Sequence, residues 1–244
     1  MTRAGPLRCV VVGEDAAHAE IAAVWVKRRV LEERDWARDI DWSDLLVWER
    51  DEAGPRPYFK HQDVKRWARG SRRVRIRFDK GDPSVSDEEG HMFLRALIWA
   101  QLQGFDVVVL GRDVDGRLKR RDGFRRAIRD RSWSLAVLGL LAEPESEAWY
   151  LAGFVPTSKG ERDALAAVRE RLRFDPTEHP HRLTSTVPGG RKDAKSVLDD
   201  LVGADTARRR DCLEAPFDRL RRVGVDCGIV DFLDQVDDRL LPLV

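Results

Sequence analysis

The chain has 244 residues, and its 44 lysines and arginines almost balance its 43 aspartates and glutamates, leaving a formal net charge of +1. A near-neutral chain gives no whole-molecule argument for a polyanionic partner, so charge has to be read segment by segment. With 42% hydrophobic and 36% charged residues, the composition predicts a soluble globular protein with a full core and a strongly solvated surface.

The cysteines Cys9, Cys212 and Cys227 include no closely spaced pair. This spacing argues against a zinc knuckle, a redox Cys-x-x-Cys motif and a disulfide framework, and it fits a reducing cytoplasm. The N-terminal segment lacks the apolar core of a signal peptide, and no run approaches the ~20 apolar residues of a membrane span. We therefore expect a cytoplasmic protein without a membrane partner. Whether the protein is a homo-oligomer is left open.

The N-terminal part has the pattern of a strand followed by a helix. Residues 7–12 form a β-branched run that predicts a strand, and the apolar spacing of residues 16–33 predicts a helix. The stretch 36–70 is irregular, and we interpret it as an excursion that holds one candidate strand at 45–48. Residues 74–78 alternate apolar side chains with arginines, which predicts a further strand with one polar face.

Between residues 92 and 154, helices and strands alternate. We expect helices over 92–103, 118–131 and 146–154, and strands over 105–110 and 135–141. The run from Val107 to Leu110 is apolar throughout, as in central parallel strands covered on both faces. Strands that alternate with helices predict an α/β fold with a parallel sheet.

The character of the sequence changes after Pro156. Helices are expected over 161–172 and 193–202, separated by a stretch rich in Pro, Thr and His, and helical stretches alternate with acidic residues over 205–244. We predict an α/β domain over residues 1–155 and a helical C-terminal part over 156–244 that packs on the sheet.

Acidic residues follow the predicted strands. Glu14 comes after the first strand, and Asp113 and Asp115 come after the strand at 105–110. Ligands of open α/β sheets bind at the carboxyl ends of the strands, where gathered carboxylates repel one another unless a cation or shared protons offset them. Hard oxygen donors suit Mg²⁺ or Mn²⁺, so we predict a metal site there. The alternative is that these residues are helix N-caps or solvated turn residues.

A third acidic group follows the strand at 135–141. Glu143, Glu145 and Glu147 straddle Pro144, just before a predicted helix. We expect two of them to face the same rim of the sheet as the other acids. Glu145 and Glu147 are therefore added to the predicted metal ligands.

Three motifs resemble the TOPRIM family, especially its small stand-alone members and the TOPRIM halves of overcoming-lysogenization-defect (OLD) nucleases. Residues 10–14, Val-Val-Val-Gly-Glu, are similar to the first strand of that family with its glutamate. Residues 108–116 are similar to the strand that carries an Asp-x-Asp motif, and Pro-Glu-Ser-Glu-Ala-Trp-Tyr-Leu at 144–151 resembles a Glu-x-Glu-Ala-Trp-Leu-Leu segment of stand-alone members. Together the motifs span roughly residues 7–155.

The resemblance implies a Rossmann-like TOPRIM sandwich in which Asp113 and Asp115 hold Mg²⁺ and Glu14 acts in metal binding or proton transfer. It also implies a nuclease acting on DNA in bacterial phage defence, with an ATPase encoded nearby as a partner. Stand-alone members commonly carry Glu-Gly and then a second Glu, whereas Glu14 is followed here by Asp15 and, at a distance, His18. We interpret His18 as a helix-surface histidine, with a role as a polar substitute for the missing acid as the alternative.

Basic side chains cluster on the segment that follows Asp115. Residues 117–131 contain eight arginines and lysines against two aspartates. We predict that five of them contact the phosphates of a nucleic acid: Arg117, Lys119, Arg120, Arg121 and Arg125. The alternative is a solvated helix face. Lys192, or else Lys195, lies in a segment that resembles the lysine-bearing segment of stand-alone relatives and would stabilise charge on a scissile phosphate.

Three functions compete. The leading hypothesis is a metal-dependent nuclease, in which a cation at Asp113 and Asp115 polarises the phosphate and activates water, with Glu14 as a further ligand or general base. The second is a non-catalytic TOPRIM-like subunit that binds a partner such as an ATPase, and the third is a Mg²⁺-dependent phosphatase or phosphotransferase acting on a small molecule. The sequence has no Walker-type Gly-x-x-x-x-Gly-Lys-Ser/Thr motif, so any use of ATP needs another chain.

Overall fold

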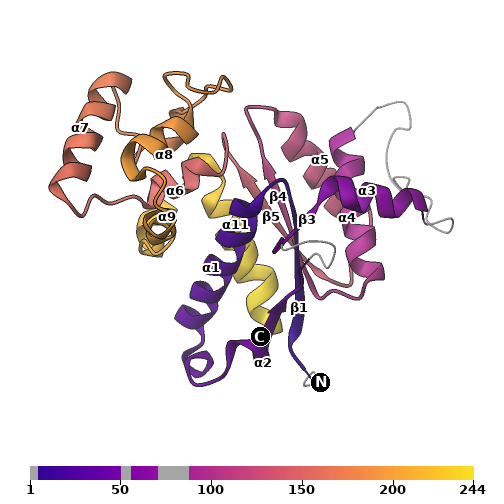
Figure 1. The fold of residues 1–244 in the computed structure, drawn as a ribbon. Coiled ribbons are helices and arrows are strands. Elements are labelled where there is room, and N and C mark those ends of the chain that lie inside the picture. The colour runs from indigo at the N-terminus through magenta and orange to yellow at the C-terminus, as the bar shows by residue number, and fades with distance from the viewer. Residues whose placement is uncertain (1–4, 51–55, 71–87) are drawn as a thin grey trace. The chain divides into compact units, whose positions relative to one another are not determined.

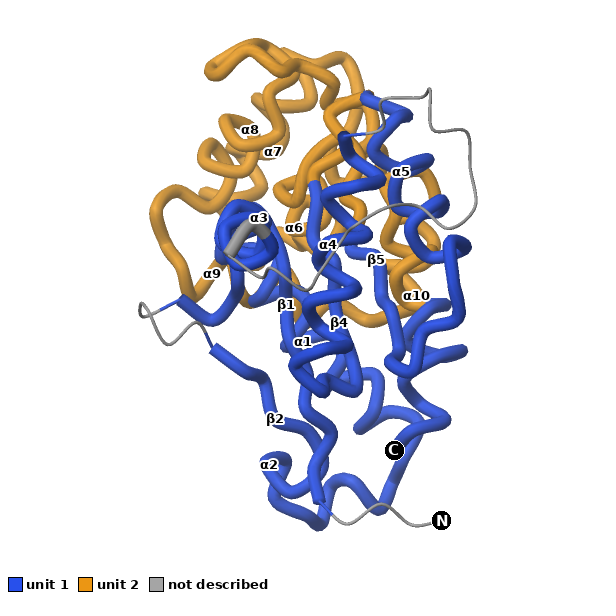
Figure 2. Tube along the Cα trace, turned by 90° about the vertical axis from the view of Figure 1, so that its right-hand side faces the viewer, with its two compact units in different colours: residues 1–112, 117–140, 234–244 blue, residues 113–116, 141–233 orange. Residues whose placement is uncertain are grey.

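The structure is a computed structural model that describes residues 5–50, 56–70 and 88–244. The chain divides into two compact units (Figure 2): unit 1 holds residues 1–112, 117–140 and 234–244, and unit 2 holds residues 113–116 and 141–233. Unit 1 carries a parallel β-sheet with flanking helices, and unit 2 is helical (Figure 1). The predicted fold class, α/β with a parallel sheet and a helical C-terminal part, is thereby confirmed.

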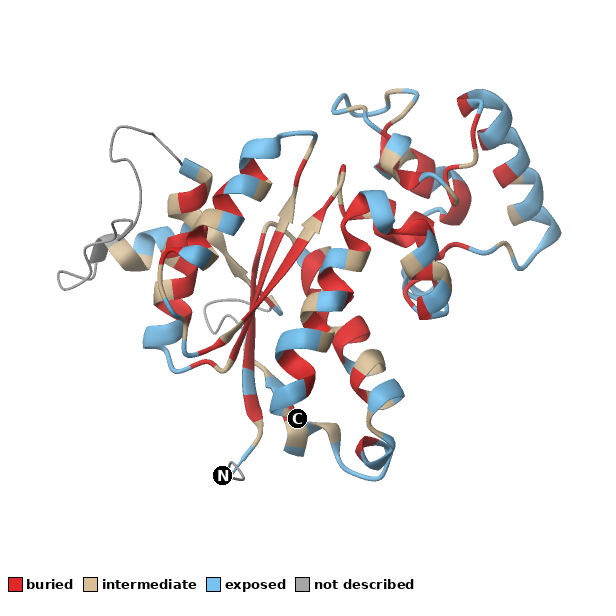
Figure 3. Cartoon of the chain, turned by 180° about the vertical axis from the view of Figure 1, so that it is seen from behind, coloured by how far each residue is buried: buried red, intermediate tan, exposed pale blue. Residues whose placement is uncertain are grey.

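The sheet is built around β1 (Leu7–Gly13). Its strand order is β2-β1-β4-β5, and β3 also pairs with β1. The neighbours of β1 are β2 (Leu46–Trp48), β3 (Phe59–Lys60) and β4 (Val107–Asp113), and β5 (Ala136–Ala142) follows β4. β1 runs parallel to its neighbours, with Cys9 opposite Val107 and Val12 opposite Leu110. These central stretches of β1 and β4 are buried (Figure 3), as expected for parallel strands covered on both faces.

The helices of unit 1 lie on both sides of the strands. They are α1 (Ala16–Glu33), α2 (Trp42–Leu45), α3 (His61–Gly70), α4 (Glu88–Leu102) and α5 (Leu118–Arg129), with 3₁₀ and π turns at η1 (Asp35–Arg38), η4 (Val236–Leu240) and η5 (Leu241–Leu243). In Figure 1, α1 and the C-terminal turns lie on one side of the strands, and α3, α4 and α5 lie on the other. Arg29 of α1 donates to Asp237 at 2.6 Å, which ties α1 to the C-terminal turns.

The helices α4 and α5 approach each other closely at a pair of glycines. A Cβ added at Gly123 of α5 would lie 2.6 Å from the backbone nitrogen of Gly90 in α4. Only glycine permits this separation. The close approach brings side chains of α4 and α5 together near β4. Within the described ranges, no helix has both the length and the apolar character that a membrane crossing requires.

Most predicted elements of unit 1 are confirmed with small shifts at their ends. The helix predicted over 16–33 is α1, and the strand predicted over 135–141 is β5. The stretch 36–70, interpreted as an irregular excursion, instead contains α3, whose sequence offers only Val64 and Trp67 as large apolar side chains to mark a helical period. The strand predicted over 74–78 lies outside the described residues.

The helices of unit 2 pack around α6 (Glu147–Gly153). The others are α7 (Lys159–Leu172), α8 (Ala194–Val202), α9 (Thr206–Cys212), α10 (Phe217–Val223) and α11 (Ile229–Gln235), with turns at η2 (Pro180–Arg182) and η3 (Val225–Cys227). Residues 148–153 are all buried, and the indole N–H of Trp149 donates to the carbonyl of Cys227 at 2.6 Å. The domain boundary predicted near residue 155 differs from this division, because α6 is the core of unit 2 rather than the last helix of a sheet domain.

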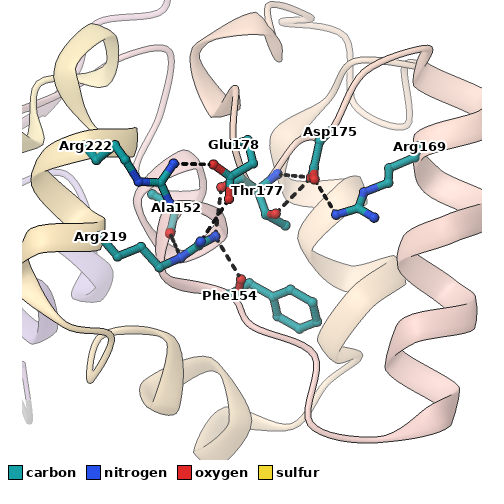
Figure 4. Close-up of polar contacts among 8 residues, drawn as sticks. All are labelled: Ala152, Phe154, Arg169, Asp175, Thr177, Glu178, Arg219 and Arg222. Atoms are coloured by element: carbon teal, nitrogen blue, oxygen red, sulfur yellow. Dashed lines mark hydrogen bonds and ion pairs between the residues drawn. The ribbon is translucent and has the colours of Figure 1, made fainter.

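Arg219 of α10 holds the C-terminal end of α6 (Figure 4). The last turn of a helix leaves carbonyls without an intrahelical donor, and the Arg219 guanidinium donates to the carbonyls of Ala152 at 3.1 Å and Phe154 at 3.4 Å. It also donates to the Glu178 carboxylate at 2.8 Å, whose second oxygen accepts from Arg222 at 2.6 Å. These contacts fix the direction of α6 within unit 2.

His18 of α1 is fully buried against the ends of β1 and β4. Its ring Nδ1 is 2.9 Å from the carboxylate of Asp15, which also accepts from the backbone N–H of Ala17 and caps α1. A Cβ at Gly111 would lie 2.7 Å from the His18 side chain, and one at Gly13 would lie 3.3 Å from it. The interpretation of His18 as a helix-surface histidine is therefore wrong, and two glycines on adjacent strands make room for its ring.

We predict that Gly111→Ala lowers the free energy of unfolding by about 1–3 kcal/mol, because the added methyl group overlaps the His18 ring. His18→Ala removes that ring, so the double variant should lose less stability than the sum of the two single variants. Urea unfolding of the wild type and the three variants measures this coupling.

Gly160→Ala on α7 is the matched control, since a Cβ there would lie 3.8 Å from Ser158 Oγ, an ordinary contact. This variant should not be destabilised, because alanine favours a helix over glycine. Strictly additive losses for Gly111→Ala and His18→Ala would contradict the packing described for His18.

Candidate functional site

A ladder of hydrogen bonds within unit 2 pins Asp113–Gly116 to residues 142–146. The backbone N–H groups of Val114, Asp115 and Gly116 donate to Ala142 O at 2.7 Å, Pro144 O at 2.8 Å and Glu143 Oε1 at 3.1 Å, and the backbone N–H of Ser146 donates to Asp113 Oδ1 at 2.9 Å. The segment after β4 therefore runs beside the segment after β5. This pairing holds Asp113 next to the loop that carries Glu145 and Glu147.

Four carboxylates of unit 2 gather here, and we call them the acidic cluster: Asp113, Glu145, Glu147 and Asp193. Glu145 and Glu147 flank Ser146, and the Ser146 hydroxyl donates to Glu147 at 3.3 Å. Asp193 immediately precedes α8. Glu147, Asp113 and Asp193 all lie near enough to Glu145 for their negative charges to act on its carboxyl group. The structure thus brings together three of the predicted metal ligands and adds one that was not predicted.

The negative charges of the acidic cluster act on the carboxyl group of Glu145. Burial, and then the charges of Glu147, Asp113 and Asp193, raise the pKa of Glu145 from 4.5 to about 7. The backbone N–H of Lys195, at the start of α8, donates to this carboxylate and partly offsets the rise. Its Oε1 atom is buried and has no hydrogen-bond partner among the described residues. Such an environment favours a proton or a cation at Glu145.

The donor chemistry of the acidic cluster fits a hard divalent cation. Carboxylate oxygens are the protein ligands that Mg²⁺ and Mn²⁺ prefer, and the buried Oε1 of Glu145 is an acceptor of that kind. In the part of the chain that the structure describes, no three acidic, histidine or cysteine side chains are already set to hold a metal ion. Cation binding at the acidic cluster therefore requires side-chain rotation, which the χ angles of glutamate permit.

The other two predicted ligands, Asp115 and Glu14, have different surroundings. Asp115 adopts a left-handed backbone conformation, with φ of 50°, a region that aspartate enters more readily than most residues and that recurs at functional sites. Glu14 belongs to unit 1, where it forms an ion pair with Arg112. The convergence of Glu14 with Asp113 and Asp115 stays a prediction.

Arg112, the residue before Asp113, is the centre of an ion-pair network in unit 1. Its guanidinium pairs with Glu14 and, at 2.9 Å, with Glu89 of α4. Arg120 of α5 lies 3.5 Å from the same oxygen of Glu89, and its side chain is only 7% exposed. Arg120 is thus held inside the fold beside Glu89. This placement removes Arg120 from the side chains available for the predicted phosphate contacts.

The remaining predicted phosphate contacts are open to solvent on α5 and just before it. Arg117, Lys119 and Arg125 are exposed, and Arg121 is partly exposed. Arg125 lies 4.0 Å from Asp122, a separation at which an exposed ion pair contributes little. These side chains can reach a phosphate without any change in the fold.

The segment before α8 carries the predicted Lys192 and the unpredicted Asp193. The ammonium of Lys192 lies 6.0 Å from the centre of the Phe174 ring, within cation–π range. Burial alone would raise the pKa of Asp193, but hydrogen bonds from the Ser196 hydroxyl and the Gly189 backbone N–H keep it below its ordinary value. The sequence signalled Asp193 only as an aspartate before a helix, a position that usually means a cap.

Glu145 makes the stability of the metal-free protein depend on pH in one direction. Its folded-state pKa of about 7 lies above the ordinary value of 4.5. Its contribution to the free energy of unfolding is therefore fully present below pH 4.5 and is lost as the pH rises through 7. Glu145→Gln cannot ionise and should be more stable than the wild type at pH 8 by on the order of 1–3 kcal/mol. The gain should vanish near pH 4. Urea unfolding in EDTA at both pH values measures it.

Glu143→Gln is the matched control for this measurement. Its amide oxygen can still accept from the backbone N–H of Gly116, as the carboxylate does at 3.1 Å. Its stability at the same two pH values shows the effect of removing a carboxylate that lies beside the acidic cluster but is not part of it. A Glu145→Gln variant that is less stable than the wild type at pH 8 would contradict the repulsion described for the acidic cluster.

Replacing Lys119 and Arg125 together with Gln should weaken binding to duplex DNA equally at all sequences, because phosphate contacts carry no base information. Each lost contact should reduce the slope of log K against log salt by about 0.9. Fluorescence anisotropy at several salt concentrations measures the slope. The control pair Lys159→Gln and Arg162→Gln, exposed on α7, removes the same charge elsewhere. An unchanged slope in the Lys119 and Arg125 variant would show that these side chains of α5 face solvent and do not contact DNA phosphates.

No protein-family model matches this chain, and no curated protein or solved structure matches it. The resemblance to the TOPRIM family stays a prediction from three short motifs.

Proposed function

We propose that the acidic cluster binds Mg²⁺ or Mn²⁺ and that the protein uses this cation to hydrolyse phosphodiester bonds in nucleic acid, with DNA as the substrate. One observation carries the proposal: the buried, unpartnered Oε1 of Glu145 lies among the charges of Asp113, Glu147 and Asp193. Carboxylates gathered in this way need a proton or a cation, and hard oxygen donors select the cations that also bind phosphate oxygens.

The residues of the acidic cluster have separate parts in this chemistry. A bound divalent cation would polarise the phosphate and lower the pKa of a water molecule. Asp113 accepts from the Ser146 backbone N–H at 2.9 Å and Glu147 accepts from the Ser146 hydroxyl at 3.3 Å, so one serine orients two of the ligands. Glu145 would join them as a ligand once the cation has displaced the proton that its raised pKa of about 7 retains. Lys192 supplies positive charge for a phosphate oxygen.

The choice of nucleic acid over a small phosphate ester is supported by α5. This helix starts three residues after Asp115 in the chain, and Lys119 and Arg125 leave their charges in solvent. Cations presented along one helix suit a repeating polyanion better than a single phosphate group.

A second function, a non-catalytic subunit that binds a partner such as an ATPase, is favoured by the state of Glu14. The leading hypothesis uses Glu14 as a further ligand or general base. Its carboxylate is instead engaged by the guanidinium of Arg112, an ion pair that competes with coordination of a cation. In this second function the cation would serve binding rather than cleavage.

The variant Asp113→Asn with Glu145→Gln tests the proposal, because it removes two ligand charges while keeping side-chain volume. The wild type should unfold at a higher temperature in Mg²⁺ or Mn²⁺ than in EDTA, and it should nick supercoiled plasmid. The double variant should remain folded, lose the shift in unfolding temperature and lose nicking. Circular dichroism melts and agarose gels measure the two effects.

Asp218→Asn, an exposed aspartate on α10, is the control and should keep both the shift and the nicking. Nicking retained by the double variant would refute a catalytic acidic cluster. A wild type that is stabilised by the cation but never cleaves DNA would favour the second function.

A further inference from the structure

Two cations of unit 2 share one aromatic ring. The guanidinium of Arg182, in the turn η2, lies 4.3 Å from the centre of the Phe174 ring, and the ammonium of Lys192 lies 6.0 Å from the same centre. Both distances are within cation–π range. The two charged groups are therefore no farther apart than the sum of these distances. We call Arg182 and Lys192 the cation pair.

The Phe174 ring belongs to the packed interior of unit 2, and it limits how far either cation can move. Phe174 is only 8% exposed. The loop that leads to Lys192 is closed by the backbone N–H of Ser185, which donates to the Lys192 carbonyl at 3.1 Å. Arg182 itself is exposed. A ligand can therefore reach its guanidinium without any change in the fold.

Neither member of the cation pair forms an ion pair with a described residue. Ion pairs with carboxylates engage six other arginines of unit 2, namely Arg169, Arg171, Arg208, Arg209, Arg219 and Arg222. An aromatic ring attracts a cation without cancelling its charge. The cation pair thus keeps two positive charges near each other, and a bound anion would offset their repulsion.

The cation pair is carried by segments that pack on the same helix as the acidic cluster. Lys192 immediately precedes Asp193, which belongs to that cluster. The turn η2 and the helix α8 both pack on α6, whose first residue is Glu147. Successive phosphates of one nucleic-acid strand are about 3.4 Å apart along the helix axis. One strand can therefore contact both groups of residues.

We infer that Arg182, positioned by Phe174, binds the phosphate next to the one that is cut. The inference rests on the proposed function and deepens it, because it makes a second phosphate part of the substrate. A guanidinium suits this role, since its planar fork matches the oxygens of a phosphate. Lys192, already assigned to the phosphate at the acidic cluster, and Arg182 then contact successive phosphates. The substrate is a polynucleotide rather than an isolated phosphodiester.

Anisotropy of a fluorescein-labelled DNA duplex, measured in EDTA at several salt concentrations, tests this contact without cleavage. Arg182→Gln should weaken binding about tenfold and reduce the slope of log K against log salt by about 0.9, because one phosphate contact is lost. Arg182→Lys should keep the slope, since an ammonium also neutralises a phosphate. Arg162→Gln, which removes an exposed arginine of α7, is the matched control and should behave as the wild type does.

Two substrates separate this inference from the proposed function. Bis(para-nitrophenyl) phosphate has one phosphodiester group and no neighbouring phosphate. In Mn²⁺ and at subsaturating substrate, Arg182→Gln should nick plasmid about tenfold more slowly than the wild type, and both should hydrolyse bis(para-nitrophenyl) phosphate at the same rate. A wild type that cleaves neither substrate would contradict the proposed function, whereas a reduced salt slope in Arg182→Gln would still support the phosphate contact.

An unchanged salt slope in Arg182→Gln would overturn the inference, even with an active nuclease. Equal losses on plasmid and on bis(para-nitrophenyl) phosphate would also overturn it, because Arg182 would then act through the acidic cluster. A circular dichroism melt shows whether Arg182→Gln folds. If it does not, the wild type carries the test: bound DNA should protect Arg182 from phenylglyoxal, as read by mass spectrometry, and unprotected Arg182 would refute the contact.

Discussion

β4 ends with two residues of opposite charge, Arg112 and Asp113, and each has its own set of partners. Arg112 pairs with Glu14 and Glu89, where opposite charges compensate one another. Asp113 accepts from the Ser146 backbone and contributes its charge to Glu145, where like charges accumulate. A chain with a net charge of +1 thus has a compensated network in unit 1 and an acidic cluster in unit 2.

The sequence predicted the elements whose apolar pattern is strong and local. β1, β4 and β5 are nearly continuous apolar runs, and α1 has a clear helical period. The predicted exposure of Arg120 and His18 was wrong, although the helical period of the surrounding residues indicated that both are buried. Arg120 lies four and seven residues before the buried Phe124 and Ala127, and His18 lies three and seven residues before the buried Ile21 and Trp25. The residue types favour the surface, but the helical spacing places both side chains on the buried face.

The acidic cluster could be predicted only in part from the sequence. Asp113, Glu145 and Glu147 follow strands, and the carboxyl ends of parallel strands meet at one edge of a sheet, so topology alone brings them together. Asp193 follows no strand, and it joins them because α8 packs on α6. That contact depends on side-chain packing between helices distant in the chain, which no local pattern encodes. That Glu14 lies near these acids is still a prediction, based on the shared edge at which parallel strands end.

The raised pKa of Glu145 explains how one cluster can be both stable in the metal-free protein and ready for a cation. A carboxyl group with a pKa of about 7 is protonated in about half of the molecules at neutral pH, and that single proton relieves much of the repulsion among the four acids. A divalent cation binds the same oxygens and must displace this proton, so its affinity rises with pH. Burial of Glu145 therefore sets a competition between proton and cation. The outcome of that competition, rather than the number of acids present, distinguishes a structural acidic cluster from a catalytic one.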